Sequence, residues 1–574
     1  MLRRALSRQM PSYVRMAKSP SLIGGALSAA AALQSRSYCH AFVPVPVLLP
    51  PPPTRILASA STSPSAMQAL VTATRENALK AAAFISRAAR YAGRLVLYGV
   101  LGAPMLVLFP CARTLGDTFP ALEHLTWGYM IWAVQTLGPC FIKLAQWAST
   151  RPDLFPPRLV SRLIRLQDDV DVHHAPGTVD RTMAEAFGPA WRGKLRLDEK
   201  PLGAGSVAQV FKGYINRAAL PPDDPNHGQG EICVAVKMIH PHVDLLVRTD
   251  MELLSLFAWG MDQFASLEIL SLGETCRQFA ETMNKQLDLR VEAHNLRTFA
   301  RKFENEGWAK FPQPVEGFVS KNVLVETLLT GKPISHYMNM DSTGNKALED
   351  LKLKISDLGV RLILKMVFFD NFIHGDLHPG NLMVEVENGE PTMVVLDCGI
   401  VYCSRTEEEF KHLVDICIAF MKHDGRAAAR HMIQITPETV KHEDEFEESI
   451  QQMVNDSEEQ SYFEHIGDYV SRICELSRKH LVRLDPGYFR IAMALKVAEG
   501  ISLSLNRDLD LVSKCIPIII KAQSLRALGI SKFPPPEDDP DRTRDMRAEY
   551  EAELLRTKKL QEAEALDRRR RQQK

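Results

Sequence analysis

The sequence has no clustered cysteines and no excess of charge of either sign. Its ten cysteines are scattered, and no two of them form a Cys-x-x-Cys pair. This spacing argues against a bound metal and against a disulfide framework, and it favours a reducing compartment. Lysine plus arginine and aspartate plus glutamate number 69 each, so the formal net charge is zero. No overall field therefore indicates nucleic acid as a partner.

Acidic residues are missing from the start of the chain. The first is Glu76, and eight arginines and lysines precede it among many serines and alanines. This composition predicts that residues 1–75 are a mitochondrial transit peptide, which includes a proline-rich linker from Val43 to Pro53. The alternative is a disordered basic tail.

Charge is also missing from Leu95–Ala112, which Arg94 precedes and Arg113 follows. The stretch is long enough to span a bilayer core, and a membrane helix tolerates Pro104 in its middle. We therefore expect residues 76–124 to be membrane-associated, with a transmembrane helix at 95–112. The alternative is a buried helical hairpin that is broken at Pro104.

The length of 574 residues exceeds what one hydrophobic core usually holds. We expect a two-lobed domain with extensions at both ends. The C-terminal extension, residues 533–574, begins with a Pro/Asp linker and is rich in charge, which favours a solvated helix.

The first phosphate-binding signal is the segment Pro201–Gly213. Its glycines lead into an alternating apolar run, which favours a strand–turn–strand whose backbone amides can approach phosphates. The predicted contacts are Gly203, Ala204, Gly205, Ser206 and Val207. Taken alone, this pattern also fits a plain hairpin.

A lysine inside an apolar strand supplies the second signal. Ile232–Lys237 reads as a buried strand, and an amine there costs free energy unless it meets an anion. A Val-Ala-Val-Lys strand after a glycine-rich hairpin is the phosphate-binding arrangement of kinases. Glu292, in a segment of helical composition, is a candidate partner that would hold Lys237 over the phosphates. Asp288 lies four residues before Glu292, so the two are expected to share one helix face.

The decisive segment is Phe372–Val384. Asp376 and Asn381 are spaced as in a kinase catalytic loop, where the carboxylate orients the attacking hydroxyl and the amide oxygen binds magnesium. Asp397, in an Asp-x-Gly after an apolar strand, would be the second metal ligand. The sequence therefore predicts an ATP-dependent phosphotransferase site that uses Mg²⁺.

Two absences argue against an ordinary protein kinase. Gly375 stands where most protein kinases carry arginine, and no Ala-Pro-Glu follows the Asp-x-Gly. The chain offers a helix cap already at Thr406–Glu409. A long segment for docking a peptide is therefore missing.

One further motif distinguishes the candidates. Gly138–Leu154 reads as an apolar helix with a polar stripe that includes Lys143 and Gln146. The segment resembles the Lys-x-Gly-Gln signature of the aarF/UbiB atypical kinase family, and the resemblance extends over roughly residues 125–510. It includes Leu166–Asp168 and Ala498–Gly500.

The resemblance implies an α+β, two-lobed protein-kinase-like fold with family-specific N-terminal helices. The implied boundaries are 125–200 for the helical extension, 201–330 for the N-lobe and 331–532 for the C-lobe. In this reading Lys143 and Gln146 face the nucleotide pocket, Lys237 and Glu292 act with Asp376 in catalysis, and Asn381 and Asp397 bind the metal.

The resemblance also implies a setting. The protein would be an ATPase or a small-molecule or lipid kinase at the mitochondrial inner membrane. Its activity would support coenzyme Q biosynthesis or related lipid metabolism. Its partners would be ATP, membrane lipids or isoprenoid-quinone precursors, and coenzyme Q biosynthesis proteins. The rival hypotheses are a non-catalytic pseudokinase scaffold and a conventional protein kinase.

Three departures from the family pattern affect these expectations. Ala145 replaces the glycine of the Lys-x-Gly-Gln signature, and Gln286 replaces a glutamate that would pair with Lys143. Gly203 and Gly205 stand where the founding members have alanines, which makes the loop more like that of a kinase.

Deleting residues 1–75 should abolish mitochondrial location, because the membrane potential draws in a cationic segment. The test is fluorescence microscopy of tagged full-length and shortened chains. Deletion of residues 541–574, which are also highly charged, is the control and should not change the location. Unchanged location after the N-terminal deletion would contradict the prediction.

Overall fold

The computed structural model describes most of the chain between residues 64 and 524. The described ranges are 64–115, 118–149, 177–222, 226–261, 272–342, 344–404, 406–433, 443–460, 466–480, 486–506 and 517–522, with single residues 163, 224, 482, 484, 514 and 524. Residues 1–63, the Leu166–Asp168 motif and the charged tail lie outside the described residues. The transit peptide and the tail therefore stay predictions.

The chain divides into two units, of which the first comprises residues 1–137 and 173–177. Its described part is a pair of helices, α2 (Pro64–Leu115) and α3 (Pro120–Leu137). The Arg94 guanidinium donates to the Leu137 carbonyl at 2.8 Å, and the Tyr129 hydroxyl donates to the Leu101 carbonyl at 3.0 Å. Helix α2 continues through Pro104, as expected of the predicted membrane helix, so the alternative of a hairpin broken at this residue is wrong.

Helix α2 is long and apolar enough to cross a membrane, as judged by length and composition. The relevant stretch is Ala78–Ala112, within which an 18-residue window has a mean hydropathy of 2.1. Its large side chains are exposed: 79% of Leu106 and 61% of Val100 are accessible. Exposed leucine and valine along one long helix favour a lipid environment, although the same test is passed by some helices of soluble proteins.

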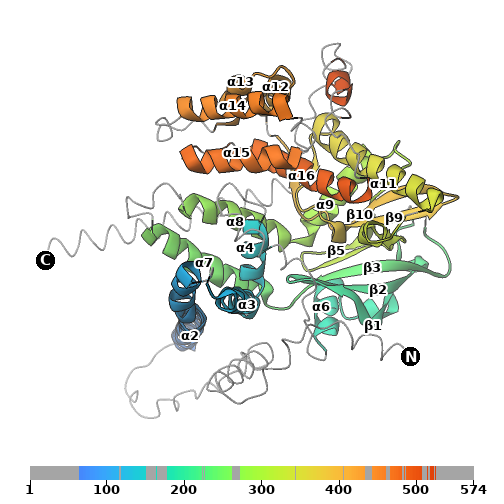
Figure 1. Cartoon of the computed structure of the whole chain (residues 1–574). Coiled ribbons are helices and arrows are strands. Elements are labelled where there is room, and N and C mark those ends of the chain that lie inside the picture. Colours follow the sequence, from blue (N-terminus) through green and yellow to red (C-terminus); the bar gives the residue numbers. More distant parts are fainter. Residues whose placement is uncertain are drawn as a thin grey trace. The chain divides into compact units, whose positions relative to one another are not determined.

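The second unit comprises residues 138–172 and 178–574, and it begins its sheet structure at Leu195. Five antiparallel strands follow the order β1-β2-β3-β6-β5 (Figure 1). Their bounds are β1 Leu195–Ala204, β2 Ala208–Asn216, β3 Glu231–Ile239, β5 Pro314–Val319 and β6 Val323–Thr327. The sheet therefore starts before the expected N-lobe boundary at residue 201.

One face of this sheet is a closed apolar core. Phe211, Val236 and Met238 are buried there, together with Trp191 of the preceding 3-10 turn and Met183 of α6 (Thr178–Phe187). Because side chains alternate along a strand, Lys237 points to the opposite face. The expected strand at Ile232–Lys237 is confirmed as part of β3, in which Val234, Ala235 and Val236 are buried and Cys233 is exposed.

Four helices of the second unit carry two of the sequence motifs. They are α4 (Pro139–Ser149), α7 (Val243–Met261), α8 (Leu272–Gln286) and α9 (Leu289–Lys302). Helix α4 packs on α7 and α8, where the rings of Trp147 and Phe279 lie 5.8 Å apart. The spacing of Asp288 and Glu292 predicts that they share a helix face, and this prediction is wrong. Asp288 precedes α9 as its N-cap and accepts from the Arg290 amide.

The C-lobe combines small sheets with a set of helices (Figure 1). Its sheets contain β4 Ala309–Lys310, β7 Lys332–Pro333, β8 Ile373–His374, β9 Leu382–Glu387, β10 Glu390–Val395 and β11 Val401–Tyr402. Its helices are α10 Ile334–Met338, α11 Lys346–Leu364, α12 Glu407–Met421, α13 Gly425–Met432, α14 Glu443–Gln460, α15 Ile466–His480 and α16 Pro486–Leu505. The predicted cap is confirmed, because Thr406 Oγ1 accepts from the Glu409 amide at the start of α12.

The full-length protein should stay in the membrane pellet after alkaline carbonate extraction, because α2 presents an apolar surface. The double variant Val100→Arg/Leu106→Arg should shift protein into the soluble fraction, since each central arginine costs about 2.5–3.5 kcal/mol on insertion. Leu256→Arg, at an exposed position of α7, is the control and should remain in the pellet. Complete extraction of the unaltered protein would contradict a spanning α2.

Candidate active site

The site begins with a buried ion pair between β3 and α9. Lys237 Nζ lies 2.7 Å from Glu292 Oε1, and the side chains are only 12% and 5% exposed. The Asp288 cap fixes the start of α9, which places Glu292 in its first turn. Burial raises the pKa of Glu292 to about 7, although the adjacent ammonium opposes this shift.

Asp397 is the second carboxylate on Lys237. Its Oδ1 lies 2.9 Å from Lys237 Nζ, and its side chain is 47% exposed. Burial alone would raise the pKa of Asp397, but the charge of Lys237, with a further contribution from Lys143, holds it well below its usual range. Asp397 is therefore ionised throughout the physiological range and faces accessible space.

Two buried side chains hold the peptide groups on either side of Asp397. The Asn295 amide donates to the Cys398 carbonyl at 2.8 Å, and His374 Nε2 donates to the Leu396 carbonyl at 3.2 Å. Burial lowers the pKa of His374, and its Nδ1 accepts from the Asp376 amide, so the ring is neutral with its proton on Nε2. Asp397 itself has φ 51°, a left-handed conformation that this support maintains.

The catalytic-loop residues join the same network. Asn381 Nδ2 donates to the Asp376 carbonyl at 3.0 Å, and the Leu396 amide donates to the Asn381 carbonyl at 2.8 Å. Asn381 is 8% exposed, and this bond leaves its Oδ1 as the available side-chain acceptor. Asp376, Asn381 and Asp397 are thus linked through adjacent backbone groups.

Lys143 reaches the catalytic loop from α4. Its Nζ lies 3.9 Å from Asp376 Oδ2, and the two side chains are 20% and 32% exposed. Lys143 therefore has a carboxylate partner even though Gln286 replaces the glutamate that the family pattern provides. Ala145 is buried in the helix packing, and Gln146 is half-buried near the middle of α4.

The glycine-rich loop lies at the β1–β2 turn. Gly203 and Ala204 end β1, and the Gly205 amide donates to the Ala208 carbonyl at 2.8 Å. His240 anchors the turn, because its ring bonds the Gly205 carbonyl and its amide donates to the Val207 carbonyl. Ser206 Oγ is buried without a hydrogen-bond partner among the described residues. The loop is thus on the sheet edge, outside the ion-pair cluster.

Sequence reasoning missed Glu326, a third carboxylate near Lys237. Glu326 lies on β6, and burial, followed by the charge of Glu292, raises its pKa to about 8. The available signal was a single acidic residue within the apolar strand Val323–Thr327. Its position beside the kinase motifs depends on strand pairing, which spacing in the sequence does not reveal.

The chain after Asp397 folds back at once onto the catalytic loop. Strand β11 pairs with β8, and the Gly375 amide donates to the Ile400 carbonyl at 2.9 Å. A Cβ on residue 375 would lie 2.5 Å from Cε2 of Tyr402, so an arginine cannot occupy this position without a shift. Asn371 also bonds both the amide and the carbonyl of Ser404.

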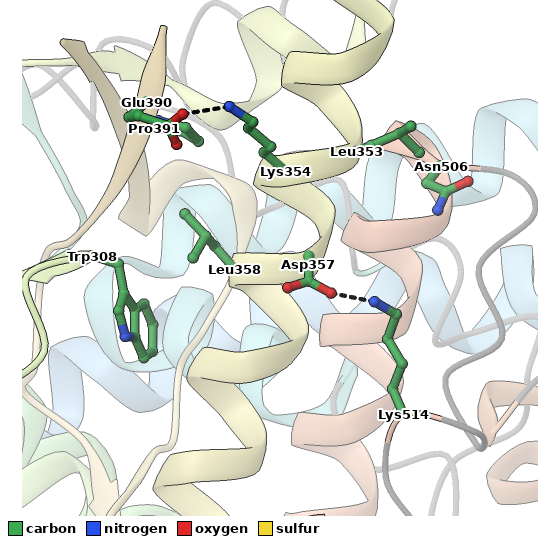
Figure 2. Close-up of a pocket in the computed structure, with 9 residues that line it drawn as sticks. All are labelled: Trp308, Leu353, Lys354, Asp357, Leu358, Glu390, Pro391, Asn506 and Lys514. Atoms are coloured by element: carbon green, nitrogen blue, oxygen red, sulfur yellow. Dashed lines mark hydrogen bonds and ion pairs between the residues drawn. The ribbon is translucent and has the colours of Figure 1, made fainter. Parts of the chain in front are cut away.

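A separate surface pocket of about 490 Å³ lies on the C-lobe, between α11 and β10 (Figure 2). Its charged lining residues are already paired, Lys354 with Glu390 and Lys514 with Asp357. None of the predicted site residues lines it. This pocket is therefore not the candidate active site.

The antiparallel N-lobe sheet, the Lys237–Glu292 pair and the Asp376–Asn381 loop beside Asp397 define a protein-kinase-like domain. Residues 165–432 match the family model described as the ABC1 atypical kinase-like domain. The chain therefore carries an atypical kinase domain of the ABC1 family, the aarF/UbiB family, and both the predicted fold class and the family resemblance are confirmed.

Known relatives are similar over most of their length. A probable serine/threonine-protein kinase of Dictyostelium discoideum is 26% identical over 505 residues, which cover 75% of this chain and 69% of the relative. A mitochondrial ABC1 family protein of Saccharomyces cerevisiae is 27% identical, with 72% of each chain covered. The probable protein kinase UbiB of an Enterobacter species is 29% identical, with 67% of this chain and 68% of the relative covered.

Replacing Gly375 by alanine should lower the thermal midpoint and impair the site, because the added Cβ overlaps the Tyr402 ring. Overpacking of this kind costs about 1–3 kcal/mol. Gly203→Ala is the matched control, since a Cβ there has no neighbour within 4 Å. Differential scanning fluorimetry compares the two variants, and Gly375→Ala/Tyr402→Ala should recover part of the loss. Equal midpoints for both single variants would contradict the close packing.

Proposed function

We propose that this chain is an ATP-dependent phosphotransferase or ATPase whose phosphate acceptor is water, a small molecule or a lipid. The observation that carries the proposal is the arrangement at Asp397. An ionised, half-exposed carboxylate is supported on both sides and lies next to the only buried lysine on the pocket face of β3. This is the arrangement that a magnesium–nucleotide site requires.

The donor set fits magnesium and a polyphosphate. Asp397 and the Oδ1 of Asn381 are hard oxygen ligands of the type that Mg²⁺ prefers, and they would hold the ion. Bound there, Mg²⁺ would neutralise phosphate charge. Lys237 would bind phosphate oxygens, with Glu292 keeping its ammonium in place. The exposed glycine-rich turn around Gly203 would lie close to the same phosphates.

Asp376 would orient the acceptor hydroxyl or water and accept its proton. Lys143 lies beside this carboxylate, where the end of an acceptor must enter. Its position supports a small acceptor, because a lysine side chain from α4 occupies space that a docked peptide needs. Gln146, further along α4, would line the same approach.

The segment after Asp397 also disfavours a peptide substrate. Residues 400–404 run along the catalytic loop, because they are hydrogen-bonded to Gly375, to Asn371 and to strand β8. A protein kinase uses the corresponding segment as a platform for its substrate. A conventional protein kinase is therefore the weaker candidate.

The setting of the proposed activity is the mitochondrion. The basic leader, the apolar helix α2 and the yeast relative that is named mitochondrial support a location at the inner membrane. Coenzyme Q biosynthesis or related lipid metabolism follows from the family resemblance, with membrane lipids, isoprenoid-quinone precursors and coenzyme Q biosynthesis proteins as partners. A pseudokinase scaffold remains the rival, because it needs the same fold without turnover.

Purified full-length protein should release phosphate from ATP in a magnesium-dependent reaction, which phosphate analysis with and without lipid vesicles measures. Asp397→Asn should abolish release and magnesium-dependent ATP binding, since it removes the charged ligand and keeps the shape. Lys237→Ala should weaken ATP binding by about 1–3 kcal/mol, as for a lost charge-assisted contact.

Asp357→Asn, at a surface ion pair on α11, is the control and should behave like the unaltered protein. Binding of ATP without turnover would favour the scaffold. Efficient labelling of generic protein substrates, with no effect of Lys143→Ala on ATP affinity or phosphate release, would restore the conventional kinase. Unaltered magnesium–ATP binding in both site variants would overturn the assignment of the site.

A further inference from the structure

Glu326 shares the pocket face of the N-lobe sheet with Lys237. In the antiparallel pairing of β3 with β6, Lys237 lies opposite Leu324 and Ala235 lies opposite Glu326. Directly paired residues of antiparallel strands, and every second residue along a strand, project from the same face. Lys237, Ala235, Leu324 and Glu326 therefore line one face.

The register also places Glu326 along the direction that a bound nucleotide must take. Lys237 and Asp397 mark the phosphate end of this face. Glu326 lies two residues beyond Leu324, the strand partner of Lys237, which corresponds to about 7 Å at the rise of a β-strand. It is near the end of β6 that leads into the C-lobe. A base linked through a ribose to phosphates at Lys237 fits next to the small side chain of Ala235, which faces Glu326.

Glu326 also has an unused hydrogen-bonding atom. Its Oε2 is buried and has no hydrogen-bond partner among the described residues. Such an atom costs about 1–3 kcal/mol and is rare in native proteins, so it calls for a ligand or another explanation. Lys237 already meets Glu292 and Asp397, at 2.7 and 2.9 Å.

We propose that Glu326 binds the exocyclic amino group of adenine and thereby sets the base specificity of the site. This inference rests on the proposed nucleotide-binding function and adds a specificity-determining residue to it. A carboxyl oxygen can accept a hydrogen bond from the 6-amino group whether the acid is ionised or protonated. A purine that lacks the amino group leaves the buried oxygen without a partner, and its binding is weaker.

The test compares two ligands that differ only at position 6, the magnesium complexes of ATP and of purine riboside 5′-triphosphate. Isothermal titration calorimetry on the full-length protein should show tighter binding of ATP, by about 5–10-fold for one hydrogen bond. Glu326→Leu and Glu326→Met keep the volume and should abolish this preference. Glu326→Gln keeps an acceptor oxygen and should retain it.

Glu316→Leu is the matched control. Glu316 lies on the neighbouring strand β5 with 70% of its side chain exposed, and its replacement should keep the preference. An unchanged preference in the folded Leu and Met variants, or no preference in the unaltered protein, would overturn the role of Glu326 and leave the nucleotide site intact. Failure of the unaltered protein to bind either triphosphate would overturn both the site and this inference.

Discussion

The ion pairing of one lysine with two carboxylates is the interaction on which the rest of the site depends. Lys237 brings together β3, α9 and the chain that follows β10, which are far apart in the sequence. Burial alone would lower the pKa of this lysine, but Asp397 and Glu292 raise it above its ordinary value, so its charge is secure. With Glu326 nearby, three carboxyl groups surround the single ammonium of Lys237. Such a cluster is suited to a metal cation that accompanies an anionic nucleotide.

Those parts of the site that lie within one short segment could be predicted from the sequence. The spacing of Asp376 and Asn381, the apolar strand around Lys237 and the Thr406 cap each depend on neighbours a few residues away. The pairing of Lys237 with Glu292 was predictable because the kinase arrangement prescribes it. Roles within that arrangement, such as metal binding by Asp397, stay proposals.

Features that depend on strand register or on packing could not be predicted. Glu326 reaches the site because β6 pairs with β3 in one particular register, and Gly375 is needed because Tyr402 and Ile400 pack on it. Asp288 was misread because its spacing from Glu292 fits a helix face, whereas the helix begins one residue later. The hairpin broken at Pro104, which was the alternative to a membrane helix, does not form, because proline can remain within a long helix when its neighbours continue the hydrogen-bonding pattern.

The support of Asp397 from two directions has a mechanical consequence. Asn295 belongs to α9 of the N-lobe, as Glu292 does, whereas His374 belongs to the C-lobe. An outward swing of α9 would therefore break the lysine pair and free the Cys398 carbonyl in a single movement. The position of α9 thus links the Lys237 ion pair to the support of the peptide group that follows Asp397.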